Sequence, residues 1–181
     1  MAELGPNSFL QRLMGAAALD PAIYEEVEAD SGALWQAMVV VVLASLSAGV
    51  GAVGFGGSIA VAPLFAVVAL MSWASWALVT FEVGSRLMPT ADTRVSLGQL
   101  LRTIGFAATP GLISALGFMP GLTIPVFIVS SVWMLVAMIV AVRHALDFES
   151  TARAVGVCVV GWVLAIGIAA LLGLLFSPAV S

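Results

Sequence analysis

The sequence predicts an all-α polytopic membrane protein with five transmembrane helices, preceded by short amphipathic N-terminal helices. The first observation behind this is composition, because 62% of the 181 residues are hydrophobic, 9% are charged and the mean hydropathy is +1.17. Soluble domains are about 45–50% apolar and about 25% charged, so this chain has too much apolar surface for one small soluble core. The second observation is that the apolar residues form five runs, each long enough to cross a bilayer.

Residues 1–32 are predicted to be a cytoplasmic interfacial segment made of two short amphipathic helices. In "NSFLQRLMGAAAL" the apolar residues recur at helical spacing, and Asn7 or Ser8 is available as the N-cap. Asp20 and Pro21 are typical of an N-cap and a first helical residue, and they open the stretch "PAIYEEVEAD". The acidic residues of this second helix are expected to form a solvated face.

The five-span membrane domain is predicted over residues 33–176, followed by a short tail at 177–181. Its five apolar runs are residues 33–51, 59–81, 103–119, 122–142 and 154–176. Charged side chains lie outside these runs and only on alternate connections. Because loops that carry arginine stay cytoplasmic, we expect the N-terminus inside and the C-terminus outside, in a bacterial inner membrane.

The cytoplasmic connections carry the arginines that follow the first span. We expect these side chains to contact anionic headgroups or partner proteins, because basic residues near a membrane surface are attracted to anionic lipid. Glu82 and Arg86 are four residues apart, in the orientation that favours a helix-end ion pair. The predicted lipid or partner contacts are Arg86, Arg94, Arg102, Arg143 and Arg153.

The third span contains a helix breaker near its middle. Ser96 and Gln99 form a capping-box pattern, so a helix is expected to start at about residue 97. Pro110 lacks an amide hydrogen, which leaves the carbonyl of Phe106 without its main-chain partner. In lipid that carbonyl needs another donor, such as Thr109 or a polar group of a neighbouring helix. We therefore predict a kinked, tightly packed third span, with kink and packing residues Gly105, Phe106, Pro110 and Gly111.

The stretch "VSLGQLLRTIGFAATPGLI" resembles the third-span region of the Yip family, the Ypt-interacting proteins. The family's Gly-aromatic-small-x-x-Pro pattern would correspond here to Gly105, Phe106, Ala107 and Pro110. The stretches "LDPAIYEEVEADSGALW" and "AVRHALDFESTARAVGVCVVGW" are similar to the start and the tail of prokaryotic Yip-domain proteins. This resemblance implies five spans with a cytoplasmic N-terminus. The family's eukaryotic role, binding of Rab-type GTPases, is not carried over because the acidic "DLYGP"-type motif is absent.

The chain offers few side chains for catalysis or for metal binding. His144 is the single histidine, and neither a second histidine nor a nearby cysteine accompanies it, so no metal site and no enzyme activity is expected. No cofactor is expected either; His144 is the one candidate axial ligand for a porphyrin or chlorin, beside the preferred interpretation that it meets lipid headgroups. A net charge of −4 without any lysine argues against nucleic acid as a partner.

These observations favour a non-catalytic integral membrane protein. We expect it to be an organiser or accessory subunit that binds other membrane proteins, whose identity the sequence does not name, within the lipid bilayer. One alternative is a transporter or channel for lipid or small apolar solutes; proton coupling is disfavoured because the predicted spans hold no charged group. Another alternative is an ancillary subunit of a photosynthetic or respiratory membrane complex.

The predicted orientation can be tested with single cysteines in a chain whose Cys158 is replaced by alanine. With an impermeant thiol reagent applied to intact cells, we expect labelling of Ser181→Cys but not of Ser31→Cys or Asp92→Cys, because the arginine-rich loops remain inside. Membrane disruption should expose all three positions to the reagent. External labelling of Asp92→Cys before disruption would contradict the orientation.

Overall fold

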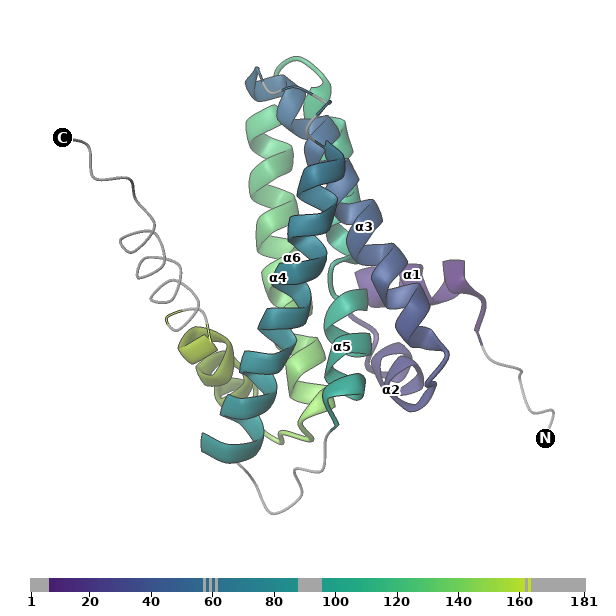
Figure 1. The fold of residues 1–181 in the computed structure, drawn as a ribbon, viewed down its shortest axis with the longest axis vertical. Coiled ribbons are helices and arrows are strands. Elements are labelled where there is room, and N and C mark those ends of the chain that lie inside the picture. Colours follow the sequence, from purple (N-terminus) through teal and green to yellow (C-terminus); the bar gives the residue numbers. More distant parts are fainter. Residues whose placement is uncertain are drawn as a thin grey trace.

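A computed structural model describes residues 7–56, 58, 60, 62–87, 96–161 and 163, and every regular element in them is a helix (Figure 1). Helix α1 is Phe9–Ala17, α2 is Pro21–Ala29, and α3 is Ala33–Ala52, continued by the 3-10 turn η1, Val53–Phe55. Helix α4 is Ala62–Glu82 and ends in the π-helical turn η3, Val83–Leu87. The following elements are α5 Leu97–Phe106, the 3-10 helix η4 Thr109–Phe118, α6 Thr123–Ala145 and a helix at Thr151–Gly161.

Three helical segments within the described residues are long and apolar enough to cross a membrane: Ala33–Phe55, Leu97–Phe118 and Thr123–Ala145. They coincide with the first, third and fourth spans that the sequence predicts. The 21-residue α4 lies where the second span was expected. The helix Thr151–Gly161 begins near the start of the predicted fifth span, but residues 164–176 lie outside the described residues. The all-α membrane fold is therefore confirmed, whereas the count of five spans stays a prediction.

The long helices α3, α4 and α6 run lengthwise through the molecule, and the shorter α5 lies between them in the lower half of the view (Figure 1). One buried cluster joins the two N-terminal helices to α3, α5 and α6 through side chains such as Tyr24, Val27 and Phe106. A second cluster joins α4, α5, the end of α6 and the helix Thr151–Gly161 through side chains such as Leu100 and Val157. The N-terminal segment is thus part of the folded core rather than an appendage.

The local signals that start helices act as the sequence predicts. Ser8 caps α1, and its main-chain amide is bonded in return by the side chain of Gln11. Asp20 caps α2 through the amide of Ala22, with Pro21 at the first helical position. These caps, and the reciprocal bonds between Ser8 and Gln11 in particular, supply partners for main-chain donors that the first turn of a helix would otherwise leave unpaired.

Among the acidic residues of α2 and its C-cap, Glu25 is exposed as expected, but Glu26, Glu28 and Asp30 are paired within the protein. The guanidinium of Arg12, only 2% exposed, lies 2.8 Å from a carboxylate oxygen of Glu26 and 2.8 Å from one of Asp30, and it donates to Gln36 of α3 at 3.0 Å. Glu28 accepts a hydrogen bond from Gln99 of α5 at 2.9 Å. The expectation was wrong for these residues because their partners are 14 to 71 positions away in the sequence. Helical periodicity cannot reveal pairing over such separations.

Breaking the Arg12 network should loosen the N-terminal helices. Arg12→Leu leaves the carboxylates of Glu26 and Asp30 without their cation, so we expect a loss of about 1–3 kcal/mol. This is below the roughly 3–5 kcal/mol of a fully buried pair, because the Asp30 side chain is 39% exposed. Hydrogen exchange should rise in residues 9–29 more than in α6. The control Arg86→Leu removes an exposed ion pair and should change stability by less than about 0.5 kcal/mol. Equal effects of the two variants would contradict this role for Arg12.

The same network makes N-terminal docking depend on pH. Hydrogen bonds from Arg12 and from the Gly32 amide lower the pKa of Asp30. Burial raises the pKa of Glu26, but hydrogen bonds from Asn7 and Arg12 outweigh this and lower it. Carboxylates with a lowered folded pKa stabilise the docked state above their unfolded pKa, and that stability is lost as pH falls through the folded pKa. Proteolysis within residues 9–29 should therefore increase below the ordinary carboxyl range, and less so in Arg12→Leu.

Candidate functional site

The third candidate span changes its helix type where the sequence places Pro110. Helix α5 ends at Phe106, two residues form a turn, and η4 continues from Thr109 as a 3-10 helix. The hydroxyl of Thr109 donates to the carbonyl of Phe106 at 2.6 Å, and both residues are buried. Thr109 thus supplies the donor that the proline cannot. The sequence predicts a kink in a continuous α-helix. The structure instead has a transition from the α-helix to a tighter 3-10 helix.

The ten residues of η4 are long for a 3-10 helix, because such runs seldom exceed three or four residues. A narrow helix lets neighbouring main chains approach, and glycines mark the closest points. A methyl group added to Gly105 would come within 2.6 Å of the Cβ of Ala37, and one added to Gly111 within 2.8 Å of the Met134 sulfur. Gly117 and Gly51 bring the main chains of η4 and α3 into direct contact. The small residues therefore form a packed seam between α3, η4 and α6.

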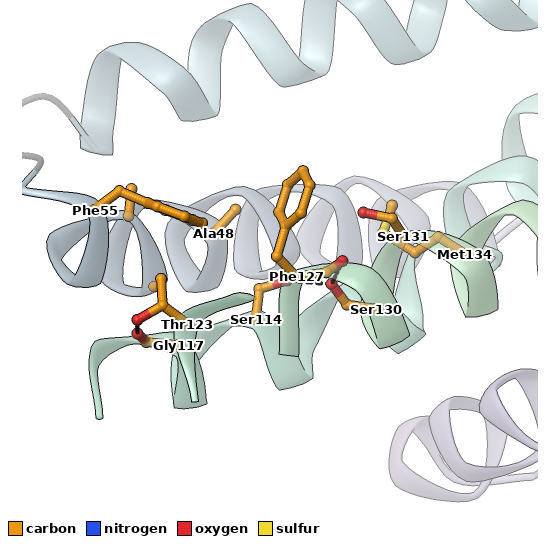
Figure 2. Close-up of a pocket in the computed structure, with 11 residues that line it drawn as sticks. Ala48, Phe55, Ser114, Gly117, Thr123, Phe127, Ser130, Ser131 and Met134 are labelled. Atoms are coloured by element: carbon orange, nitrogen blue, oxygen red, sulfur yellow. Dashed lines mark hydrogen bonds between the residues drawn. The ribbon is translucent and has the colours of Figure 1, made fainter. Parts of the chain in front are cut away.

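Beyond this seam a groove of about 270 Å³ lies between α3 with η1 on one side and η4 with α6 on the other (Figure 2). Phe55 and Phe127 meet edge to face across it, with ring centroids 6.1 Å apart. The volume is near the lower end of the roughly 300–1,000 Å³ typical of ligand pockets. The lining residues are Ala48, Gly51, Ala52, Phe55, Ser114, Gly117, Thr123, Phe127, Ser130, Ser131 and Met134.

The groove is polar only through hydroxyl groups, and most of these are already paired. The hydroxyl of Ser114 bonds that of Ser130 at 3.1 Å, and Ser130 also donates to the carbonyl of Phe127 at 3.2 Å. Thr123 donates to the carbonyl of Gly117 at 2.7 Å, as the dashed contact in Figure 2 shows. None of the lining residues is ionisable. The chemistry of the groove therefore fits an uncharged, largely apolar group. Sequence reasoning missed it, although the hydroxyls at 114, 123, 130 and 131 within apolar runs were a visible signal.

The predicted cytoplasmic arginines differ in their surroundings. Arg102 donates to the carbonyls of Val27 and Glu28, so it caps the C-terminal end of α2. Arg143 donates to the carbonyls of Phe148 and Glu149 and to the Thr151 hydroxyl, each at 3.2 Å, and thereby ties down the chain after α6.

The remaining arginines lie closer to the surface or outside the described residues. Arg86 pairs with Glu82 at 3.0 Å, and both side chains are exposed. Arg153 lies over the ring of Phe148, 5.8 Å from its centre. Arg94 is outside the described residues. Contacts of these arginines with lipid or with partners stay a prediction, for which Arg86 and Arg153 are exposed candidates.

His144 packs against the N-terminal helices near the end of α6. Its ring is parallel to that of Tyr24, with centroids 6.5 Å apart, and its Nδ1 lies 3.8 Å from a carboxylate oxygen of Glu25. In the described part of the chain no three histidine, cysteine or acidic side chains come together as metal ligands. The arrangement places His144 in a structural contact between α6 and α2.

The comparison with protein families agrees with this architecture. The family model of the Yip1 domain matches residues 17–172. The chain belongs to the Yip1 family. No curated protein and no solved structure matches it. The Yip1 match covers most of the chain and begins at the last residue of α1, so nearly all of that helix precedes it. Family membership together with the apolar helices identifies an integral membrane protein.

The break at Pro110 should be necessary for the packed seam. Pro110→Ala would add an amide hydrogen that can bond the Phe106 carbonyl, which in an isolated helix relieves about 3 kcal/mol. In the bundle we expect the opposite, a loss of about 1–3 kcal/mol of thermal stability in detergent, because an α-helix at 109–118 would move Gly111 and Gly117 out of contact. Pro125→Ala is the matched control, since that proline lies in the exposed first turn of α6 and should be near neutral. A more stable Pro110→Ala protein would show that the break is incidental.

Proposed function

We propose that this Yip1-family protein is a non-catalytic organiser or accessory subunit that binds other membrane proteins within the bilayer. The observation that carries the proposal is the surface of α6. Unlike the buried segment Leu97–Phe118, α6 exposes large apolar side chains between residues 124 and 136. These side chains include Ile124, Phe127, Ile128, Val129, Val132, Leu135 and Val136.

An apolar surface in lipid does not by itself distinguish lipid from protein as its neighbour. Two features favour a helical partner here. Ser131 is exposed among the apolar residues of α6 and gives a small polar position at which a second helix can approach and form a hydrogen bond. The exposed carboxylate of Glu25 on α2 provides a charged contact for a partner at the cytoplasmic side. Together they suit a partner that has both a membrane helix and a cytoplasmic segment.

The proposed setting is a five-span protein with its N-terminus inside and its C-terminus outside, in a bacterial inner membrane. The arginines on alternate connections support this orientation. Within it, residues 1–32 form the cytoplasmic interfacial segment, residues 33–176 the membrane domain, and residues 177–181 the tail.

The groove supports a second candidate function, transport or binding of lipid or small apolar solutes. Its hydroxyl-and-phenyl lining accepts an uncharged apolar group. Flux of a fluorescent lipid or an apolar solute in liposomes that contain only this protein would favour this candidate. A fixed, stoichiometric partner would instead favour an ancillary subunit of a photosynthetic or respiratory membrane complex.

Site-specific photocrosslinking in native membranes tests the proposed partner surface. A benzophenone amino acid at Val132, which is 57% exposed, or at Leu135 should give one discrete protein adduct. The matched control at Met71 of α4, 67% exposed, should give lipid adducts. The double variant Val132→Ala and Leu135→Ala keeps the surface apolar but flattens it, so the adducted protein should copurify several-fold less. Lipid adducts at all three positions, with no copurifying protein, would contradict the proposal.

A further inference from the structure

Helix α1 lies crosswise to the long helices α3, α4 and α6 (Figure 1). Two contacts show at what height α1 lies along the candidate spans. The Phe9 ring meets the ring of Phe106 edge to face, with centroids 6.4 Å apart, and Phe106 is the tenth of 22 residues in the candidate span Leu97–Phe118. The indole of Trp133 donates to the carbonyl of Ala17 at 2.8 Å. Both contacts are near the middle of a candidate span rather than at its end.

The position of Trp133 can be converted into a depth. It is the eleventh of the 23 residues of α6, so it lies about 15 Å from Thr123 and about 18 Å from Ala145 along the helix. The whole of α6 is about 34 Å long, and the hydrocarbon core of a bilayer is about 30 Å thick. If α6 spans the bilayer, Trp133 lies well inside the hydrocarbon, and so does the end of α1 to which it bonds.

The charges of α1 are compatible with that depth. Arg12 is the one ionisable residue in the helix, and its guanidinium faces inward to Glu26, Asp30 and Gln36. The side-chain oxygen of Gln11 is bonded to the amide and hydroxyl of Ser8. The outward face instead presents Leu10 and Met14, four residues apart and 63% and 58% exposed. This face therefore has no charge that needs water.

The C-terminal end of α1 has a protein partner for each of its last four carbonyls. The carbonyl of Met14 accepts from the Ala18 amide at 2.9 Å, and that of Gly15 from the Asp20 amide at 2.9 Å. Ala16 accepts from the Leu19 amide and from the Tyr24 hydroxyl, each at 3.1 Å, and Ala17 accepts from Trp133.

Water can serve the last carbonyls at a helix end that faces solvent, whereas none of the last four carbonyls of α1 depends on water. Leu19 adopts a left-handed conformation, with φ of 63°, to make the turn that pairs two of them. A left-handed conformation is strained for a residue other than glycine, and the Tyr24 hydroxyl and the Trp133 indole supply two further donors. This strain is explained where water is absent, because an unpaired carbonyl in lipid is strongly destabilising.

We propose that α1 is embedded crosswise in the acyl-chain region of the leaflet on the arginine-bearing side, with Leu10 and Met14 against lipid chains. The occupant of this face is the bilayer itself, since the face is continuous with candidate spans that contact α1 at mid-length. The inference does not depend on the proposed protein partner, because it concerns a different helix and a different neighbour. It places α1 deeper in the bilayer than the interfacial position proposed for residues 1–32 as a whole.

Spin-label accessibility tests the position of α1 in the full-length protein. Single nitroxides are placed at Leu10→Cys, Met14→Cys or Glu25→Cys in a Cys158→Ala background, reconstituted in vesicles of phosphatidylethanolamine and phosphatidylglycerol. At positions 10 and 14 we expect the nitroxide to be several-fold more accessible to oxygen than to a water-soluble nickel chelate. The nitroxide at the exposed position 25 should be more accessible to the chelate than to oxygen. Greater chelate than oxygen accessibility at 10 and 14 would overturn the proposal. So would protection from both reagents, which would mean that protein covers this face.

A second measurement keeps the proposal testable if the labels disturb the helix. Trp133→Phe keeps the ring but removes the donor to the Ala17 carbonyl. In the bilayer we expect hydrogen exchange at the amides of residues 18–20 to rise about tenfold or more, because the Ala17 carbonyl stays unpaired in the closed state and the opening that brings these amides to water becomes more favourable. The control Trp73→Phe removes a similar bond to the Leu101 carbonyl and should leave these amides unchanged. A change of less than about twofold in Trp133→Phe would show that water reaches the end of α1, which overturns the proposal.

Discussion

The hydrogen bond from the Thr109 hydroxyl to the Phe106 carbonyl is the contact on which the packed seam between α3, η4 and α6 depends. In lipid each main-chain polar group needs a partner from the protein, and Pro110 removes one such partner in the middle of a candidate span. Thr109 makes the break possible inside the core. The chain can then continue as a 3-10 helix, whose smaller radius allows Gly51 and Gly117 to bring two main chains together.

The same constraint explains how polar groups are distributed along the bundle. At the groove end, hydroxyls bond to one another or to carbonyls, as Ser114 does with Ser130 and Thr123 with Gly117. At the other end, charges are paired between helices, as Arg12 is with Glu26 and Asp30. Hydroxyls can be satisfied locally in a dry interior, whereas ion pairs need either water or several partners to offset desolvation. The groove end therefore offers apolar surface, and the charged end joins the N-terminal helices to the spans.

Local patterns predicted the parts of the fold that depend on neighbours in sequence. The capping signals at Ser8, Asp20 and Ser96 each act within three residues, and the apolar runs of α3 and α6 reflect their own length and composition. The Arg12 network, the groove and the Trp133 contact were not predicted. Trp133 and Ala17 are 116 residues apart, and no periodicity in one sequence connects them. The expected solvated acidic face was wrong for Glu26 and Glu28 for the same reason, because their partners are on other helices.

These features together limit how the protein can act. Arg102 and Arg143, for which the sequence predicts headgroup or partner contacts, are bonded to the protein's own carbonyls. The groove lining has no ionisable residue, so it provides no acidic or basic side chain to carry a proton. What the described residues leave available is surface: the apolar length of α6, the outward face of α1 and the exposed carboxylate of Glu25. In the described residues, Arg12, Arg102 and Arg143 are bonded within the protein while apolar side chains of α6 and α1 face outward, and this arrangement supports the proposed role of binding other components of the bilayer.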